Sequence, residues 1–252
     1  MKHWIFFLIL LFSTAIPLMA QRHFYPSRPG DDVVRYEGMV YGVKRGINCP
    51  RLYYTSNALR NLPHEFLLKK SYGCFVEMPL WGKFTIAPEF NVQHRGGSTT
   101  FKFAGQKVSY ILLAKYVSVR TPVYCYFPIS DLVKPYLFLG PDFGVAVKGE
   151  INGYGQTVNI NSRNINRLYV GTLSGAGVRV NVPLRWITMV LKLEAALNLG
   201  LLDTYANAEK EGTAHPLNVQ AYTIDGHRYS RGLEVHLGLG FFLNKIDGCG
   251  RF

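Results

Sequence analysis

Beyond its first twenty residues the sequence lacks any long apolar run. After residue 21 no stretch approaches the roughly 18 consecutive apolar residues of a membrane-spanning helix. This absence excludes helical spans from the body of the chain. It does not by itself indicate a soluble protein, because membrane-spanning β-strands alternate apolar with polar residues and give a weak signal per segment.

Cysteine is also scarce, with four residues in 252, at Cys49, Cys74, Cys125 and Cys249. No Cys-x-x-Cys pair or matching histidine spacing occurs, so we expect no metal site and no cofactor. Four cysteines permit three disulfide pairings in an exported protein. Cys74 falls on the apolar face of an alternating segment, where we expect a buried thiol.

Catalytic motifs are missing as well. Neither Gly-x-Ser-x-Gly nor His-Glu-x-x-His is present, and we therefore expect no catalytic residue and interpret the protein as a non-enzyme. The alternative is a barrel enzyme with its site at a loop rim. Candidates for such a site are His64, Ser98, Asp203 and His215.

The first twenty residues follow the three-part plan of a secretory signal peptide. Lys2 and His3 supply a positive start, residues 4–12 are an unbroken apolar run, and Ala20 is the small residue before the expected cut. The alternative is an anchor kept on the mature protein. Cleavage is favoured because the apolar run is too short to span a bilayer comfortably.

What the sequence does contain is strict alternation, together with 25 glycines and 16 tyrosines. The clearest segment is 187–200, in which Lys192 and Glu194 lie at even positions. Every odd position there is apolar: Ile187, Met189, Leu191, Leu193, Ala195, Leu197 and Leu199. A period of two predicts a strand with two unlike faces.

The same pattern recurs along the chain. The eight segments are 39–48, 72–80, 84–92, 110–120, 135–147, 168–180, 187–200 and 232–243. Short turns lie near 81–83 and 183–185, and longer polar connections at 49–71, 94–108, 148–167 and 202–231. Segment 121–134 is an exception, because it is longer than a short turn.

An even strand count and turns that alternate in length are typical of bacterial barrels. We predict an all-β fold, an eight-stranded antiparallel up-and-down transmembrane β-barrel preceded by a cleavable signal peptide. The expected divisions are the signal peptide at 1–20, an N-terminal extension at 21–36, the barrel at 37–244 and a C-terminal tail at 245–252.

If the charged face of each strand points inward, the lumen holds four bases, five acids and one histidine. These residues are Lys44, Lys115, Arg179, Lys192, Glu77, Glu89, Asp142, Glu194, Glu234 and His236. An eight-stranded barrel is just wide enough to be filled by side chains. We therefore favour a salt-bridged plug over a proton or ion path.

The excess positive charge of the chain, +12 at pH 7, then falls mainly in the connections. A cationic rim is able to hold anionic lipid headgroups, sugars or an acidic protein. Ordinary solvated loop charge is an equal alternative. The basic residues are dispersed, so we expect no nucleic-acid partner.

The run 73–80 followed by 83–91 looks like the second hairpin of the PorT-family outer-membrane barrels of Bacteroidetes-type bacteria. Segments 41–48, 134–141 and 175–178 resemble the first, fifth and sixth strands of that family. Arg45 departs from the small residue usual at its position, and the chain continues past Leu243 to Phe252.

The resemblance implies a barrel of the bacterial outer membrane, with outer-membrane lipid and the assembly machinery as partners. Gly238, Phe241 and Leu243 are similar to the insertion signal of a final strand. The family also implies secretion-complex or other envelope proteins as partners, since its namesake is linked to type IX secretion.

The leading hypothesis is a non-enzymatic structural or interaction component of the envelope. A soluble periplasmic ligand-binding barrel of lipocalin type is the main alternative, and it requires the reverse assignment of faces, with charges outside. A narrow passive pore is another.

Overall fold

The computed structural model describes residues 38–54, 64–65, 67–103, 106–153, 156–159, 167–184, 187–203 and 228–243. Contacts divide the chain into Met1–Tyr36 and Glu37–Phe252, and the fold concerns the second unit. The expected signal peptide, extension and tail lie outside the described residues. Among the described residues no helix is long and apolar enough to cross a membrane.

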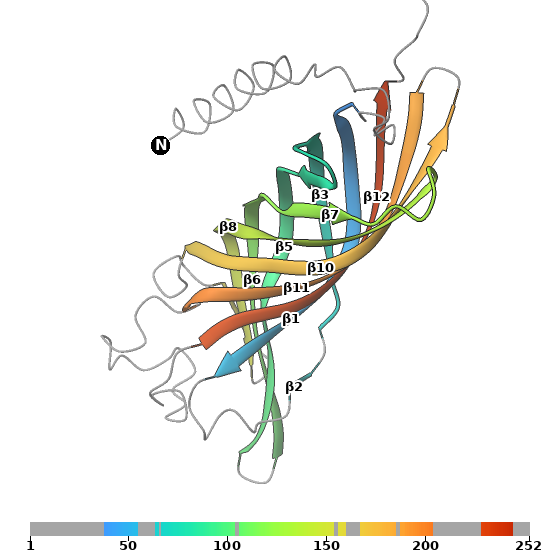
Figure 1. Cartoon of the computed structure of the whole chain (residues 1–252). Helices are drawn as coiled ribbons and strands as arrows, with labels where there is room; N and C mark the ends of the chain where they lie inside the picture. Colours follow the sequence, from blue (N-terminus) through green and yellow to red (C-terminus); the bar gives the residue numbers. More distant parts are fainter. Residues whose placement is uncertain are drawn as a thin grey trace, which may run out of the picture. The chain divides into compact units, whose positions relative to one another are not determined.

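The described residues form twelve strand segments, all in one sheet (Figure 1). They are β1 (Val40–Tyr54), β2 (His64–Glu65), β3 (Lys69–Pro79), β4 (Phe84–Ile86), β5 (Glu89–Phe103), β6 (Gln106–Arg120), β7 (Val123–Tyr126), β8 (Val133–Gly153), β9 (Gln156–Asn159), β10 (Leu168–Pro183), β11 (Ile187–Asp203) and β12 (Arg228–Leu243).

Eight of these strands close into a ring. Antiparallel pairing runs from β1 through β3, β5, β6, β8, β10 and β11 to β12, and β12 pairs back with β1. The predicted all-β, antiparallel, up-and-down barrel is confirmed. A closed ring has no free edge along its paired length, so its backbone groups satisfy one another within the wall.

The extra segments β4 and β7 continue β5 and β6 past two prolines. Pro88 and Pro122 interrupt the ladders because proline has no N–H to donate. The register nevertheless carries on, since Val76 N donates to Pro88 O at 3.0 Å and Ala87 N donates to Pro122 O at 2.9 Å. The long segment 121–134 is therefore a strand that reaches Tyr126 before it turns.

Strands extend into two of the expected polar connections, which corrects the prediction for 94–108 and 148–167. β5 runs to Phe103, β6 begins at Gln106 and β8 reaches Gly153. The 21 residues of β8 cover about 70 Å along the strand. A membrane crossing needs only about 9–11 residues, so these strands continue beyond the bilayer.

The strands are strongly staggered. Following the paired residues from Arg51 once round the ring leads to Tyr41 on the same strand, ten residues away. With strands tilted about 40° to the barrel axis and rising about 3.3 Å per residue, each residue advances roughly 2.5 Å along that axis. Each step to the next strand along this line therefore changes the level by about 3 Å.

On the strands that alternate clearly, the apolar face points outward. On β11, Leu193 is 52% exposed and Leu197 55%, whereas Lys192 and Glu194 are buried. On this strand the charged face points inward, whereas the lipocalin-type alternative requires the charges outside. The structure also corrects the expectation for Cys74, which lies on the outward apolar face and is exposed.

Candidate functional site: the charged lumen

The lumen contains five buried bases and five buried acids among the described residues. They are Lys44, Arg95, Arg120, Arg179, Lys192, Glu77, Glu89, Asp142, Glu194 and Glu234, each no more than 5% exposed. His236 is buried among them. Formal charge therefore balances with His236 neutral, as a low-dielectric interior requires.

Lys115 was expected in this set and is not part of it. It is exposed on the outer face of β6, between the buried Ala114 and Tyr116. Segment 110–120 is apolar at both odd and even positions, so its pattern did not fix which face turns inward. The inward residues of β6 prove to be Tyr116, Ser118 and Arg120.

Arg95 and Arg120 are lumen residues that the sequence analysis missed. Arg95 was assigned to a polar connection, and Arg120 was the last residue of an ambiguous segment. The signal was present in the period of two. Continuing inward from Glu89 by steps of two residues gives Asn91, Gln93 and Arg95, all of them buried.

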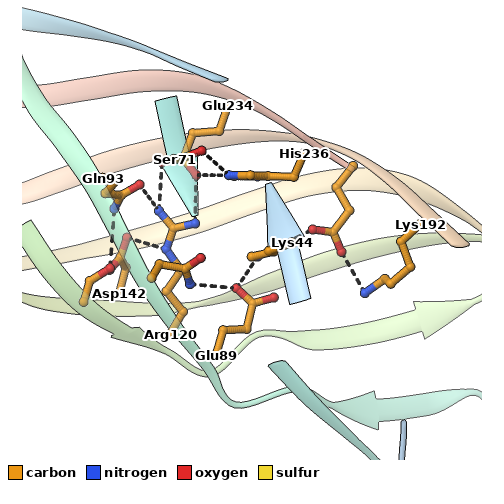
Figure 2. Close-up of polar contacts among 12 residues, drawn as sticks. Lys44, Ser71, Glu89, Gln93, Arg120, Asp142, Lys192, Glu234 and His236 are labelled. Carbon is orange, nitrogen blue, oxygen red and sulfur yellow. Dashed lines mark hydrogen bonds and ion pairs between the residues drawn. The ribbon is translucent and has the colours of Figure 1, made fainter. Parts of the chain in front are cut away.

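Arg120 is the centre of the first polar group (Figure 2). Its Nη1 donates to Glu234 Oε2 at 2.7 Å and its Nη2 to Glu234 Oε1 at 2.8 Å. Nε donates to Asp142 Oδ2 at 3.0 Å, and Nη2 also donates to Gln93 Oε1 at 2.5 Å. All three guanidinium nitrogens thus have acceptors, which offsets the cost of burying the cation.

Arg95 adds a second guanidinium to this group through Asp142. Its Nη2 donates to Asp142 Oδ2 at 2.5 Å and its Nη1 to Asn198 Oδ1 at 2.6 Å. The guanidinium carbon also lies 3.5 Å from the centre of the Tyr169 ring. Asn198 Nδ2 in turn donates to Asp142 Oδ2 at 2.6 Å. Asp142 therefore holds two arginines at once.

A second group alternates positive and negative side chains. Lys44 lies 2.5 Å from Glu89 and 3.6 Å from Glu194. Lys192 lies 2.8 Å from Glu194 and 2.6 Å from Glu77. Arg179 Nη1 completes the chain at 3.1 Å from Glu77.

Tyrosines close this second group. Tyr136 donates to Glu194 at 2.8 Å, and Tyr124 donates to Glu89 at 2.8 Å. The Lys192 ammonium lies 4.1 Å from the centre of the Tyr124 ring and 5.0 Å from that of Tyr136, within cation–π range. With Tyr126 and Phe138 these rings pack as one buried aromatic cluster.

The polar contacts cross the full width of the barrel. In a ring of eight, each strand faces the one four positions away. Arg120 on β6 meets Glu234 on β12, Arg179 on β10 meets Glu77 on β3, and Arg95 on β5 meets Asn198 on β11. Three of the four diametrically opposed strand pairs are thus joined by side chains.

A contact between a serine and a histidine in the lumen resembles part of a hydrolase site. Ser71 Oγ lies 2.8 Å from His236 Nε2, and Glu234 Oε2 is 4.0 Å from the same nitrogen. A triad needs the acid on the other ring nitrogen. Glu234 is also held by Arg120, and Ser71 is only 1% exposed. These side chains do not form a catalytic triad.

The rim residues considered for an enzyme lie on different strands where the structure describes them. Ser98 is 2% exposed on β5, and Asp203 ends β11. His64 belongs to β2, which pairs with β5 at Ser98 and Thr99. His215 lies outside the described residues.

An antiparallel closed barrel with an apolar outer face and a charged interior defines the class of transmembrane β-barrels. The family model described as "Outer membrane protein beta-barrel domain" matches residues 39–206. The chain belongs to this family, and its location is the bacterial outer membrane. The PorT-type resemblance is narrower than this family and stays a prediction.

Solved structures show similarity at low identity. Ail, the attachment invasion locus protein of Yersinia pestis, is 16% identical, with 82% of this chain and 100% of that chain covered and a TM-score of 0.39. The outer membrane protein OprG of Pseudomonas aeruginosa is 8% identical, with 81% and 95% covered and a TM-score of 0.43. No curated protein matches.

The residues that resemble an insertion signal all lie on β12. Gly238 faces the lumen, where an added Cβ would lie 3.2 Å from the Lys192 side chain. Phe241 faces outward and is 51% exposed, and Leu243 ends the strand. Their role in insertion stays a prediction.

Proposed function

We propose that this protein is a closed, non-enzymatic barrel that serves the outer membrane as a structural or interaction component. The observation that carries the proposal is the lumen itself. Ten buried charges neutralise one another across it, and an aromatic cluster packs beside them. A lumen filled in this way favours a scaffold over a pore.

The external half of the barrel supports the same proposal. β3 begins only at Lys69, and beyond that level β5 lies directly against β1. A Cβ on Gly97 would lie 2.6 Å from the backbone nitrogen of Leu52, which is itself buried. This backbone contact narrows the external mouth above the ion pairs.

Partner binding then belongs to the parts of the strands beyond the bilayer. The hairpin of β5 and β6 extends past the neighbouring strands (Figure 1). Its paired backbone runs without interruption from Glu89 and Arg120 to Phe103 and Gln106. A long two-stranded projection of this kind offers a recognition surface to another envelope protein.

Planar-bilayer recording tests the closed lumen. The purified barrel is expected to give no ion conductance above that of protein-free bilayers. The matched variant Arg120→Ala/Glu234→Ala removes both members of the ion pair that joins β6 to β12 across the lumen. In its folded form this variant is expected to conduct ions. Heat-modifiable migration on a detergent gel checks folding. Steady conductance by the wild type would contradict a closed scaffold.

Pull-down from outer membranes tests the interaction role. The wild type is compared with a variant whose hairpin tip, residues 98–111, is replaced by a two-residue turn. We expect the wild type to retain envelope proteins that the variant loses, while both show heat-modifiable migration. An identical set of captured proteins would remove the hairpin from the proposal.

The PorT-type resemblance supports a more specific role within this proposal, as a component associated with type IX-like protein secretion. Deleting the gene in its own bacterium tests it. Secreted cargo is expected to accumulate in the periplasm, and the wild-type gene is expected to restore export. Unchanged export would remove secretion and leave the scaffold role intact.

A further inference from the structure

Two cations face each other directly on the outer surface of the barrel. Arg51 on β1 is paired in register with Arg231 on β12, and both are exposed. Arg231 lies over the Tyr53 ring at 3.9 Å. Within the part of the chain that the structure describes, neither guanidinium pairs with a carboxylate. Like charges directly opposite on neighbouring strands destabilise a sheet.

A second pair of cations in register lies on another part of the wall. Lys115 on β6 is paired in register with Lys148 on β8, and both are exposed. Arg167, also exposed, comes next to them, because its carbonyl accepts a hydrogen bond from Ala146 N at 2.8 Å. Three cations therefore gather where β6, β8 and the start of β10 adjoin.

The two groups lie at the same level of the barrel. The register line that leaves Arg51 reaches Thr121 on β6 five strands later, about 15 Å lower along the axis. Lys115 precedes Thr121 by six residues on β6 and therefore lies about 15 Å higher along the axis, at the level of Arg51. Lys148 and Arg167 lie close to Lys115, so all five cations occupy one belt.

This cationic belt lies at the upper border of the apolar surface. Directly below Arg231 the outward residues of β12 are Leu233, Val235, Leu237, Leu239 and Phe241, each at least 37% exposed. From Phe241 to Arg231 is ten residues, or about 25 Å, the height of the apolar band of such barrels. The short turns lie at the other end, so the belt marks the external leaflet.

We propose that the cationic belt of Arg51, Lys115, Lys148, Arg167 and Arg231 binds the phosphate groups of anionic lipids in the external leaflet. The register places Arg51 and Arg231 side by side, and a phosphate between them satisfies both charges at once. Arginine binds phosphate oxygens bidentately. The apolar surface below the belt receives the acyl chains of the same molecule, which distinguishes a lipid from free phosphate.

Equilibrium binding of a fluorescent phosphatidic acid to the full chain in neutral detergent micelles tests the belt. The variant Arg51→Gln/Arg231→Gln is compared with the matched control Lys83→Gln/Lys69→Gln. The control also removes two positive charges, one of them at the short-turn end. We expect the belt variant to bind at least fivefold more weakly and the control to stay within twofold of the wild type.

Two further measurements complete the test. Phosphatidylcholine with the same acyl chains is expected to bind at least tenfold more weakly, and millimolar inorganic phosphate is expected not to displace the labelled lipid. Equal loss in both variants, or equal binding of both lipids, would overturn the belt. Heat-modifiable migration of each variant keeps this result separate from folding. Failure here leaves a closed, non-conducting barrel unaffected.

Discussion

Arg120 on β6 holds both carboxylate oxygens of Glu234 on β12, at 2.7 and 2.8 Å, across the full width of the barrel. Bidentate pairing of this kind fixes the distance between two opposite walls. Its strength is expected to depend on both partners being present, because Glu234 alone is a buried carboxylate without its cation and Arg120 alone keeps only Asp142 as a carboxylate partner.

Removing Arg120 alone is therefore expected to be severe. Arg120→Met leaves Glu234 without its partner and should lower the free energy of unfolding by about 3–5 kcal/mol. The double variant Arg120→Met/Glu234→Met should recover a large part of this loss, since it removes both charges. Urea unfolding in lipid vesicles measures the cycle. Additive losses would show that the two residues are not coupled.

Lys192 and Lys115 were both predicted to face the lumen, but replacing them is expected to change stability by very different amounts. Lys192→Met breaks contacts to Glu194 and Glu77 inside the lumen and should cost about 3 kcal/mol. Lys115→Met acts on the outer face and should stay within about 0.5 kcal/mol. Similar losses in both variants would place Lys115 back in the lumen.

Arg45 is an exposed cation within the outward apolar surface, with its guanidinium 5.6 Å from the Tyr72 ring centre. It lies six residues below Arg51, about 15 Å into the apolar band. Arginine near the bilayer midplane costs about 2–4 kcal/mol. Arg45→Leu should therefore stabilise the barrel by about 1–3 kcal/mol in vesicle unfolding. A loss of stability would mean that Arg45 is bound by a partner within the membrane.

Gly97 is expected to tolerate no side chain. Gly97→Val pushes a Cβ against the backbone of Arg51 and Leu52, and backbone cannot yield as a flexible side chain does. A loss of about 2 kcal/mol or more is expected. Gly38→Val is the control, because its added Cβ meets nothing within 4 Å. Equal stability of the two variants would contradict close contact between β5 and β1.

The barrel could be predicted from sequence because alternation survives wherever one face meets lipid. Segments such as 187–200 have an apolar residue at every outward position, which also predicts the inward direction of Lys192 and Glu194. The pattern failed on β6, where apolar residues occupy both faces, and on the external part of β5. There polar residues such as Arg95 and Ser98 face the lumen, so the sequence of this part of β5 has the polar composition expected of a loop.

The pairing of charges could not be predicted in the same way. Alternation gives the direction of a side chain but not its height in the lumen, which depends on the ten-residue stagger accumulated round the ring. Arg179 and Glu77 are separated by about a hundred residues, and only the register of the intervening strands brings them to one level. The five-to-five balance emerged once Lys115 was removed and the two arginines were added.

The position of Glu234 on the last strand has a consequence for how the barrel is made. Arg120 is synthesised more than a hundred residues earlier, and among the residues that the structure describes no other one meets two of its nitrogens with two carboxylate oxygens. An unfinished sheet that lacks β12 therefore carries an arginine without its main counter-charge. Completion of the wall and neutralisation of the interior become a single event, so a barrel one strand short is penalised by its own charge as well as by its open edge.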